Sequence, residues 1–460
     1  MLAVSIGPHA DVLPRIQSNR DDIMRPARFL VAMFQGGGNV PLLLPIMTRL
    51  AALGHHVRFM VGPGVRRSRL PLSEQLYRSL RTISPDVIRL REPDVNPLDV
   101  VPSVRGVAFG WVPRPFRSVA AEACVARWIP HWAQEVACEL GREPADVLVA
   151  DFVLVGALVA AEAAGVPNVA LVHTVYPRPA ARRPPYGPGW MPAVGVADGL
   201  RDAVGTFISN RIYAREALPF VNFARRKGRL RPIRSYFEQY DRASRVVVLT
   251  SPHFDPPAGF PPNVRLVGTP LVDAASSPRF PPLPAKDERP LVLVSLSTLE
   301  QGQSGVMERI LAALGVLPVQ ALVTLGPALA SSRFTPPPNV VVETFVPHGS
   351  VLPRAAALVT QCGLGTVMKA LAHGVPLLCI PLVGDQPDNA SRIEALGAGV
   401  RLPPDADAGC IRAAIERVLT DPAYRLAAQR VASAIAGEEP ERAAVDEIES
   451  VLPSAVRCTR

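Results

Sequence analysis

The sequence predicts an α/β protein built from two doubly wound, Rossmann-like domains that face each other across a cleft. Short, fully apolar runs alternate with helical patterns, which is typical of parallel strands buried on both faces of a sheet. The alternation lapses in Pro-rich text around residues 251–290 and then restarts, so each half is expected to form its own sheet. Ligands of such sheets bind at the carboxyl ends of the strands, where we look for a site.

The first half opens with a βαβ pattern. An apolar run at 28–34 leads through three glycines into a helical pattern over 40–53, and Gly54 separates this helix from a second run at 57–61. Further strands are expected at 147–150, 166–173 and 245–249. Residues 1–23 match no such element and are expected to be a disordered leader. The first domain is therefore predicted over residues 24–250.

The second half repeats the alternation after the stretch 251–290, which is predicted to be a Pro-rich linker. Its strands are expected at 291–296, 321–325, 340–342, 355–359 and 377–380. The second domain is therefore predicted over residues 291–435. Residues 436–460 are expected to form a C-terminal helix and tail that pack back on the first domain.

Composition and charge exclude several classes of protein. The chain has 460 residues, of which 48% are hydrophobic and 19% charged, so it is globular and long enough for two cores. The net charge is +9, but arginines scattered along the chain carry the excess, and this disfavours a nucleic-acid partner. The densest basic run, at 225–234, contains no acidic residue. Two interpretations stay open for it: a solvated helix face, or a surface for peripheral contact with anionic lipid or an acidic partner.

The cysteines indicate neither a zinc site nor a disulfide framework. The chain has six, and none occurs in a CxxC motif or with histidine at ligand spacing. No apolar run approaches the roughly 20 residues that a membrane-spanning helix needs. A cytoplasmic protein is therefore expected.

The sharpest chemical signals lie in the second half. Residues 360–366 (TQCGLGT) follow a strand and open a helix, and the helix N-terminus with Gly363 and Gly365 suits a phosphate or diphosphate. A glycine turn that serves packing alone is the alternative. Asp385 and Gln386 follow the next strand, where a carboxylate and an amide can bind sugar hydroxyls. A solvated turn is the alternative for this pair.

Residues 345–400, from FVPHGSV to EALGAGV, closely resemble the signature region of the UDP-glycosyltransferase superfamily (family 1 glycosyltransferases, GT-B fold), especially bacterial members that glycosylate macrolides. Residues 28–61, 147–174, 294–298 and 441–452 resemble other parts of the family. The resemblance implies that the second domain binds a UDP- or dTDP-sugar and the first domain a hydrophobic acceptor. It also implies inverting transfer of a hexose to a polyketide, terpenoid or lipid hydroxyl, without a metal cofactor.

The same resemblance assigns a donor site, residue by residue. Phe345 is expected against the nucleotide base and His348 near its edge. Gln361 and the turn from Gly363 through Gly365 to Thr366 are expected at the diphosphate. Ser297 and Thr298 would assist there. Asp385 and Gln386 would bind the sugar hydroxyls.

The acceptor side departs from the family pattern. Asn39 stands where the family has its catalytic histidine, and an amide does not accept a proton at neutral pH. Asn is also a favoured helix N-cap, which offers a structural role. Asp151 matches the family's orienting carboxylate and is a candidate base, directly or through water. His173, at the end of the strand 166–172, is a substitute base, with a structural strand-end histidine as its alternative.

Three further departures lie on the donor side. Gln361, Cys362 and Lys369 stand where the family has a diphosphate-contacting His, a Gly and a ribose-binding Glu. With Asn39, they motivate a second hypothesis, a catalytically idle homologue that acts as a binding or auxiliary subunit. A Rossmann dehydrogenase is disfavoured, because Pro41 stands where the GxGxxG motif needs its last glycine.

Two remaining features have alternative interpretations. Asp405 and Asp407 spell the metal-binding pattern DxD, but Asp407 is well placed to cap a helix that starts near Cys410, and we favour the cap. The acceptor walls are expected within 101–125 and 177–196. Their aromatic residues are Phe109, Trp111, Phe116, Tyr186 and Trp190.

Overall fold

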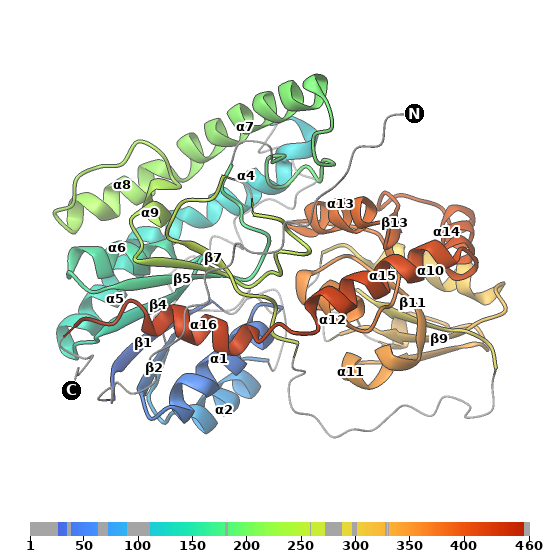
Figure 1. Cartoon of the computed structure of the whole chain (residues 1–460), viewed down its shortest axis with the longest axis horizontal. Helices are drawn as coiled ribbons and strands as arrows, with labels where there is room; N and C mark the ends of the chain where they lie inside the picture. Colours follow the sequence, from blue (N-terminus) through green and yellow to red (C-terminus); the bar gives the residue numbers. More distant parts are fainter. Residues whose placement is uncertain are drawn as a thin grey trace, which may run out of the picture.

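The computed structural model shows two parallel sheets, each flanked by helices (Figure 1). It describes residues 26–34, 38–62, 72–89, 111–179, 183–257, 259–271, 288–296, 301–326, 329 and 331–454. The predicted fold class, two Rossmann-like α/β domains, is confirmed. The predicted leader 1–23 lies outside the described residues.

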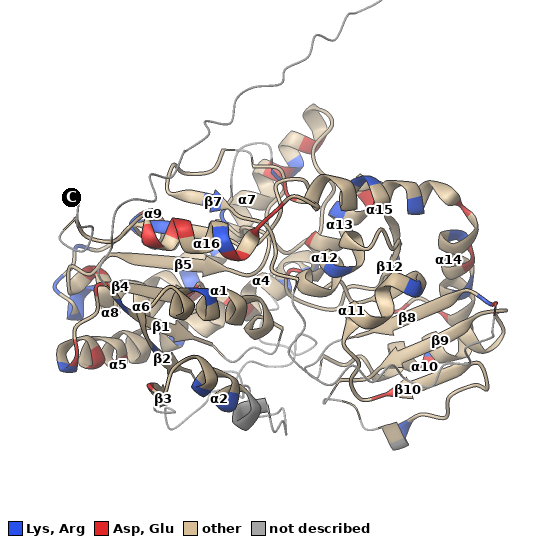
Figure 2. Cartoon of the chain, turned by 60° about the horizontal axis from the view of Figure 1, so that its bottom comes forward, with Lys and Arg blue, Asp and Glu red and all other residues tan. Residues whose placement is uncertain are grey.

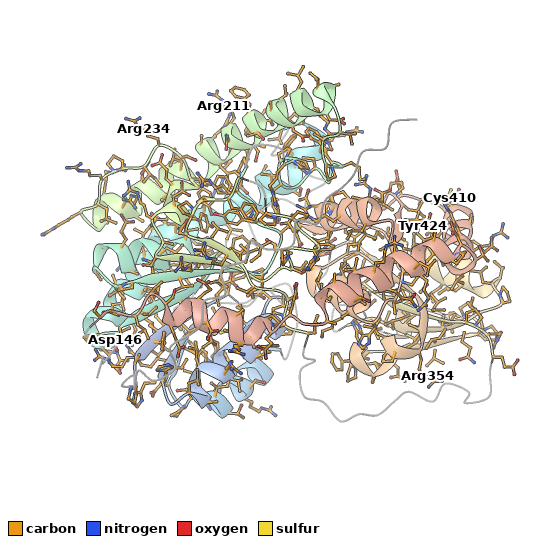
Figure 3. All side chains as sticks on the ribbon, in the orientation of Figure 1. Asp146, Arg211, Arg234, Arg354, Cys410 and Tyr424 are labelled. Atoms are coloured by element: carbon orange, nitrogen blue, oxygen red, sulfur yellow. The ribbon has the colours of Figure 1, made fainter. Side chains whose placement is uncertain are left out.

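The first sheet has the strand order β3-β2-β1-β4-β5-β6-β7, and all of its pairings are parallel. Its strands are β1 (Arg28–Met33), β2 (His56–Val61), β3 (Val87–Arg89), β4 (Val147–Asp151), β5 (Asn168–Val172), β6 (Arg245–Val248) and β7 (Val264–Leu266). All residues of β4 and β5 are buried, because helices cover both faces. Arg28 pairs with Asp146, labelled in Figure 3, and so ties β1 to the start of β4 (3.2 Å).

Helices α5 and α6 pack in close contact beside this sheet. Gly156 permits their approach, since a Cβ there would collide with the Ile129 carbonyl oxygen. The helices of the first domain are α1 (Val40–Ala52), α2 (Leu72–Ile83), α4 (Arg117–Ala123), α5 (Ile129–Arg142), α6 (Val155–Ala163), α7 (Val196–Glu216), α8 (Leu218–Lys227) and α9 (Glu238–Asp241).

The second sheet has the order β10-β9-β8-β11-β12-β13 and is also parallel. Its strands are β8 (Leu291–Ser295), β9 (Gln320–Thr324), β10 (Val340–Glu343), β11 (Ala355–Thr360), β12 (Leu377–Cys379) and β13 (Gly399–Arg401). Its helices are α10 (Ser304–Gly315), α11 (His348–Val351), α12 (Leu364–Ala372), α13 (Gln386–Leu396), α14 (Ala408–Thr420) and α15 (Pro422–Ile435). After β8 the chain adds β9 and β10 on one side of β8, and then adds β11, β12 and β13 on the other side. Sheets of this kind bind ligands at such a switch point, which lies here between β8 and β11.

The last helix, α16 (Pro440–Glu449), lies against α1 of the first domain (Figure 1). Val445 and Ile448 are buried in the core that α1 and the first sheet share. Glu449 Oε1 lies 2.8 Å from His55 Nε2, which adds a polar contact. The end of the described chain therefore returns to the domain in which it began.

The stretch 251–290, predicted to be a linker, is partly a piece of the first domain. β7 pairs with β6, and Thr269 donates a hydrogen bond to the Leu249 carbonyl (2.8 Å). The linker prediction is therefore wrong as far as residue 271, while residues 272–287 lie outside the described residues. Prolines are tolerated beside β7 because it is an edge strand, which leaves half of its backbone groups unpaired.

Basic residues are spread over both domains (Figure 2), in agreement with the scattered arginines of the sequence. The run 225–234 is not a uniform solvated face, since Arg225 is fully buried and pairs with Glu162 (2.6 Å) and Gln239 (2.6 Å). No helix in the described ranges is long and apolar enough to cross a bilayer.

Candidate active site

Three side chains meet at the carboxyl ends of neighbouring strands in the first domain. Asp151 ends β4 and is 1% exposed. Its Oδ2 accepts a hydrogen bond from Asn39 Nδ2 (2.7 Å), and its Oδ1 lies 3.4 Å from His173 Nε2. Asn39 precedes α1, and His173 follows β5. Because β1, β4 and β5 are adjacent, the fold brings the three candidate catalytic residues together.

Asn39 occupies the N-cap position of α1, but its side chain does not cap the helix. Its amide instead donates to the Phe34 carbonyl (2.6 Å) and to Asp151. The expected capping role is therefore wrong. The two hydrogen bonds of Nδ2 fix the orientation of the side chain, and the helical backbone of Asn39 (φ −76°, ψ −36°) lacks the extended geometry of a capping residue.

His173 is half-buried beside Asp151 and Phe152 of its own domain. Its ring packs edge-on to Phe152, with ring centres 5.0 Å apart. Burial lowers its pKa, but the charge of Asp151, its hydrogen bond, and the charge of Asp385 outweigh that effect, so the pKa of His173 is raised above 6.5. The charge of Asp385, in the second domain, therefore helps to raise the pKa of a candidate base in the first domain.

The expected diphosphate turn lies between β11 and α12. Gly363 is the N-cap of α12, and Cys362 before it has a left-handed φ of 71°. Glycine adopts this conformation without strain, so Cys362 stands at a position that favours glycine. A Cβ on Gly365 would lie 3.4 Å from Leu42 Cδ2 of α1, so the start of α12 faces the start of α1 across the domain interface.

The other residues expected to bind the nucleotide sugar differ in how exposed they are. Gln361 is almost buried, and its Oε1 accepts a hydrogen bond from Thr360 Oγ1 (3.3 Å). Thr366 is half-buried in the first turn of α12, and His348 is half-buried at the start of α11. Phe345 is 57% exposed, so its ring is accessible for a base to stack on. Ser297 and Thr298 lie outside the described residues.

Asp385 and Gln386 open α13 and have different surroundings. Asn389 Nδ2 donates to Asp385 Oδ2 (2.8 Å) and to the Cys362 carbonyl (2.8 Å). It therefore joins the loop 382–386, which we name the sugar loop, to the expected diphosphate turn 360–366. Burial raises the pKa of Asp385, although Asn389 and His173 partly offset it.

Gln386 accepts hydrogen bonds at Oε1 from the backbone N–H of Leu382 (2.8 Å) and Val383 (3.0 Å), and its Nε2 donates to Gln301 (3.0 Å). In the structure Gln386 therefore shapes the loop that presents Asp385.

The sequence analysis missed Glu122, which reaches the sugar loop from α4 of the first domain. Its Oε1 accepts a hydrogen bond from Tyr186 (3.3 Å) and lies 3.2 Å from where a Cβ on Gly384 would be. Burial, with the charges of Asp385 and Asp388, raises the pKa of Glu122 to about 8. No motif surrounds Glu122 in the sequence, so only the fold could reveal this contact.

Asp388 is a second residue that the sequence analysis missed. Its carboxylate accepts hydrogen bonds from the backbone N–H of Gly187 (2.6 Å) and Gly189 (3.1 Å), which adopt left-handed φ angles of 105° and 65°. Burial raises the pKa of Asp388 to about 6. Arg401 donates to the Gly189 carbonyl (2.6 Å) on the same loop. The loop 183–190 of the first domain is thus attached to the second.

The aromatic residues that were expected to line the acceptor site differ in their burial. Phe116 and Tyr186 are buried in the core, so for them that expectation is wrong. Trp190 packs edge-on against Phe116 at 5.6 Å, and Trp111 is exposed. Phe109 lies outside the described residues.

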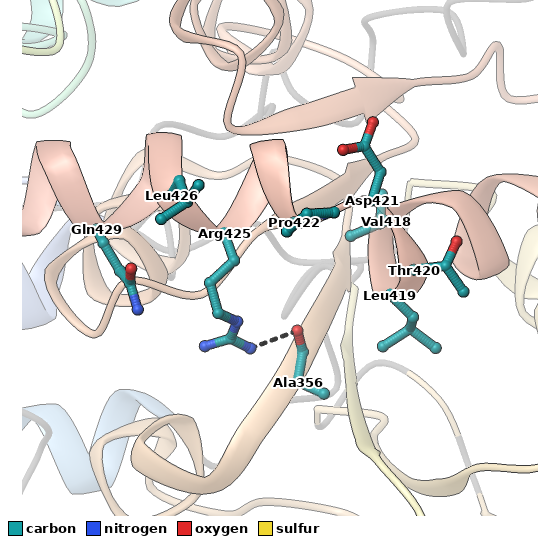
Figure 4. A pocket seen from close by; sticks show the side chains of 9 residues that line it. All are labelled: Ala356, Val418, Leu419, Thr420, Asp421, Pro422, Arg425, Leu426 and Gln429. Atoms are coloured by element: carbon teal, nitrogen blue, oxygen red, sulfur yellow. Dashed lines mark hydrogen bonds between the residues drawn. The ribbon is translucent and has the colours of Figure 1, made fainter.

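Two features of the second domain lie away from this site. Asp407 accepts a hydrogen bond from the Cys410 N–H (2.7 Å), which confirms the helix-cap interpretation of the DxD pattern. A surface pocket beside α15 is lined by none of the expected site residues, and Arg425 crosses it to the Ala356 carbonyl (Figure 4).

Comparison with known proteins decides the family. The chain is 30% identical over 436 residues to 4′-demethylrebeccamycin synthase of Lentzea aerocolonigenes, and the alignment covers 93% of this chain and all of that one. The chain belongs to the family 1 glycosyltransferases. A family model described as the C-terminal domain of erythromycin biosynthesis protein CIII-like proteins matches residues 308–450 of this glycosyltransferase.

Further similarities agree with this assignment. The glycosyltransferase is 37% identical over 172 residues to the demethyllactenocin mycarosyltransferase of Streptomyces fradiae, with 37% of each chain covered. The solved calicheamicin glycosyltransferase superposes with a TM-score of 0.70 at 22% identity, covering 93% of this chain and 99% of that one. The kitacinnamycin glycosyltransferase gives 0.68 at 19%, covering 94% and 100%. These two structures show the shared GT-B fold.

Proposed function

We propose that this glycosyltransferase moves a hexose from a UDP- or dTDP-sugar to a hydroxyl of a hydrophobic acceptor, with inversion at the anomeric carbon. The observation that carries the proposal is the cluster of Asp151, Asn39 and His173, which faces Asp385 of the other domain. The relatives named for rebeccamycin and demethyllactenocin products support an antibiotic-like acceptor.

We assign the base to His173, with Asp151 as its partner. Asn39 donates to Oδ2 of Asp151, while Oδ1 accepts the Val153 N–H (3.0 Å) and lies 3.4 Å from Nε2 of the imidazole. As the acceptor oxygen attacks the anomeric carbon, its proton passes to the imidazole, and the bond from that carbon to the diphosphate breaks. Asp151 then stabilises the imidazolium. A positioned general base of this kind contributes about 10²- to 10⁴-fold to the rate.

We assign the departing diphosphate to the N-terminus of α12, with Gln361 beside it. The first backbone N–H groups of a helix lack intrahelical partners, and they carry about half a positive charge. Such fixed donors stabilise charge that develops on the leaving group, which is why this part of the proposal includes no metal ion. Asp385 would accept hydrogen bonds from sugar hydroxyls, in a loop whose shape Gln386 and Asn389 hold.

A donor screen by thermal shift tests the donor half of the proposal. At a concentration 100 times its Kd, a UDP- or dTDP-sugar stabilises the folded enzyme by about 2.7 kcal/mol. We expect a clear rise in melting temperature for one donor with wild type and with Asp405→Asn, a control at an exposed turn of the same domain. Asp385→Asn should lose the rise. An equal response of Asp385→Asn would remove Asp385 from the donor site.

The idle-homologue hypothesis remains the second candidate, and Asn39 in place of the family's histidine is the observation that favours it. Release of UDP or dTDP in the presence of a hydrophobic acceptor discriminates the two. Turnover supports transfer. Donor binding without release, across a panel of macrolide and other polyketide acceptors, supports the auxiliary role.

A further inference from the structure

The outer side of the first domain carries an apolar ridge along α7. Val196, Leu200, Val204 and Phe207 follow one another at helical spacing, and each is between 51% and 92% exposed. The opposite side of α7 packs on α4 and α8, and buries Ile212 and Tyr213. Figure 1 shows α7 along the outer edge of the domain. Large apolar side chains seldom gather on a solvated helix face, so this ridge requires an explanation.

Basic residues continue the ridge toward α8. Arg211 and Arg215 follow on the exposed face of α7, and Arg226 and Lys227 are exposed at the end of α8. Arg211 and Arg234 extend away from the body of the domain on this same side (Figure 3). The guanidinium of Arg215 lies over the exposed ring of Trp111 (4.7 Å), which adds an amphipathic aromatic to the surface.

Acidic side chains are few on this surface and do not balance its positive charge. Asp202 is buried and pairs with Arg201, Asp198 also pairs with Arg201 (3.4 Å), and Glu216 pairs with Arg215 (3.4 Å). Arg211, Arg226 and Lys227 are exposed and have no acidic partner among the described residues. The exposed residues of 196–234, which we name the α7–α8 face, therefore combine an apolar ridge with an excess of positive charge.

We propose that the α7–α8 face docks on an anionic membrane surface. An apolar helix ridge inserts into the boundary between headgroups and acyl chains, and flanking Lys and Arg bind anionic headgroups. Charge selects this occupant over a second copy of the chain. A symmetric dimer through this face would bring the unpaired cations Arg211, Arg226 and Lys227 of two copies together, whereas anionic lipids supply the opposite charge.

The placement of α7 connects this surface to the candidate active site. The helix follows the loop 183–190, which Asp388 and Arg401 attach to the second domain. Gly205, on the buried side of α7, faces Pro185 and Trp190 of this loop, so α7 would lie between the membrane and the loop. Docking is separate from the proposed transfer reaction, so either can fail without the other.

Vesicle co-sedimentation tests the proposal on the full chain. We expect wild type to bind vesicles of phosphatidylcholine mixed with phosphatidylglycerol, to bind phosphatidylcholine alone weakly, and to dissociate as salt is added. Arg211→Gln/Arg226→Gln should lower the partition coefficient about 30-fold, from about 1 kcal/mol for each arginine. Leu200→Ser/Phe207→Ser should also lose binding, because it removes the ridge.

Matched controls lie in the second domain. Arg412→Gln/Arg430→Gln and Val316→Ser/Leu426→Ser change equally exposed residues and should bind as wild type does. Thermal unfolding checks that every variant is folded. Equal binding to neutral and anionic vesicles, or equal loss in face and control variants, would overturn the proposal. So would a wild-type dimer in sedimentation that Leu200→Ser/Phe207→Ser converts to monomer, since the face would then be a self-association surface.

Discussion

Replacing Glu122 with Gln is expected to stabilise the folded enzyme at neutral pH. Burial, with the charges of Asp385 and Asp388, raises the pKa of Glu122 from 4.5 to about 8. Folding therefore requires this carboxyl to keep a proton that the unfolded chain releases above its ordinary pKa. The contribution of Glu122 to stability is accordingly full below pH 4.5 and is lost as the pH rises from 4.5 to about 8.

The size of the effect follows from this interval. At pH 7 the pH is about 2.5 above the pKa of 4.5 that the carboxyl has in the unfolded chain. Keeping the carboxyl protonated in the folded enzyme therefore costs about 3 kcal/mol of stability at this pH. Gln ionises in neither state and can still accept the hydrogen bond from Tyr186. Glu122→Gln should therefore gain up to about 3 kcal/mol at pH 7, more at pH 8, and less than about 1 kcal/mol at pH 5.

Urea unfolding at about pH 5, 7 and 8 measures this gain. Glu416→Gln, at an exposed position of α14, is the matched control and should show no such trend. A gain for Glu122→Gln that stays constant with pH would mean that the carboxyl is already hydrated in the folded enzyme. A loss of stability at pH 7 would mean that ionised Glu122 has a partner there, and either result would refute the burial of Glu122 between the domains.

Two further predictions concern a catalytic and a structural side chain. His173→Gln should lower kcat about 10²- to 10⁴-fold while donor binding by thermal shift persists. Because the pKa of His173 is raised, kcat/KM of the wild type should fall as the pH drops below that raised value, and the variant should lose this limb of the pH profile. Arg225→Met should destabilise the first domain by about 1 to 3 kcal/mol in urea, because Glu162 loses its buried partner and keeps only Gln239 (2.9 Å) and the more exposed Arg242 (3.7 Å). A change below about 1 kcal/mol would mean that water compensates Glu162.

Much of the fold could be predicted because buried parallel strands leave a strong pattern. The run expected at 28–34 is β1 at Arg28–Met33, and the strand expected at 355–359 is β11 at Ala355–Thr360. The short edge strands β3 and β7 escaped, since three residues among prolines or polar neighbours carry no periodicity. The burial of Arg225 escaped for another reason: its partners, Glu162 and Gln239, come from elsewhere in the fold.

The candidate site was predictable where a residue follows a recognisable strand. Asp151 and His173 end such strands, and strand adjacency then brings them together. Glu122 and Asp388 were not predictable, because their contacts join halves of the chain that share no local pattern. The orientation of the Asn39 side chain could not be predicted either, because its amide nitrogen donates to Asp151, which lies far along the chain.

The hydrogen bond from Asn39 to Asp151 also indicates whether Asn39 marks a lost activity. An amide at this position holds one oxygen of Asp151, and the other oxygen lies 3.4 Å from the imidazole of His173. A base and its orienting carboxylate are thus both present, with the imidazole supplied by β5 instead of the start of α1. If Asn39 were a remnant of lost function, nothing would require its amide to align Asp151. The arrangement is better explained by a relocated base, in which Asn39 positions the carboxylate and His173 receives the proton.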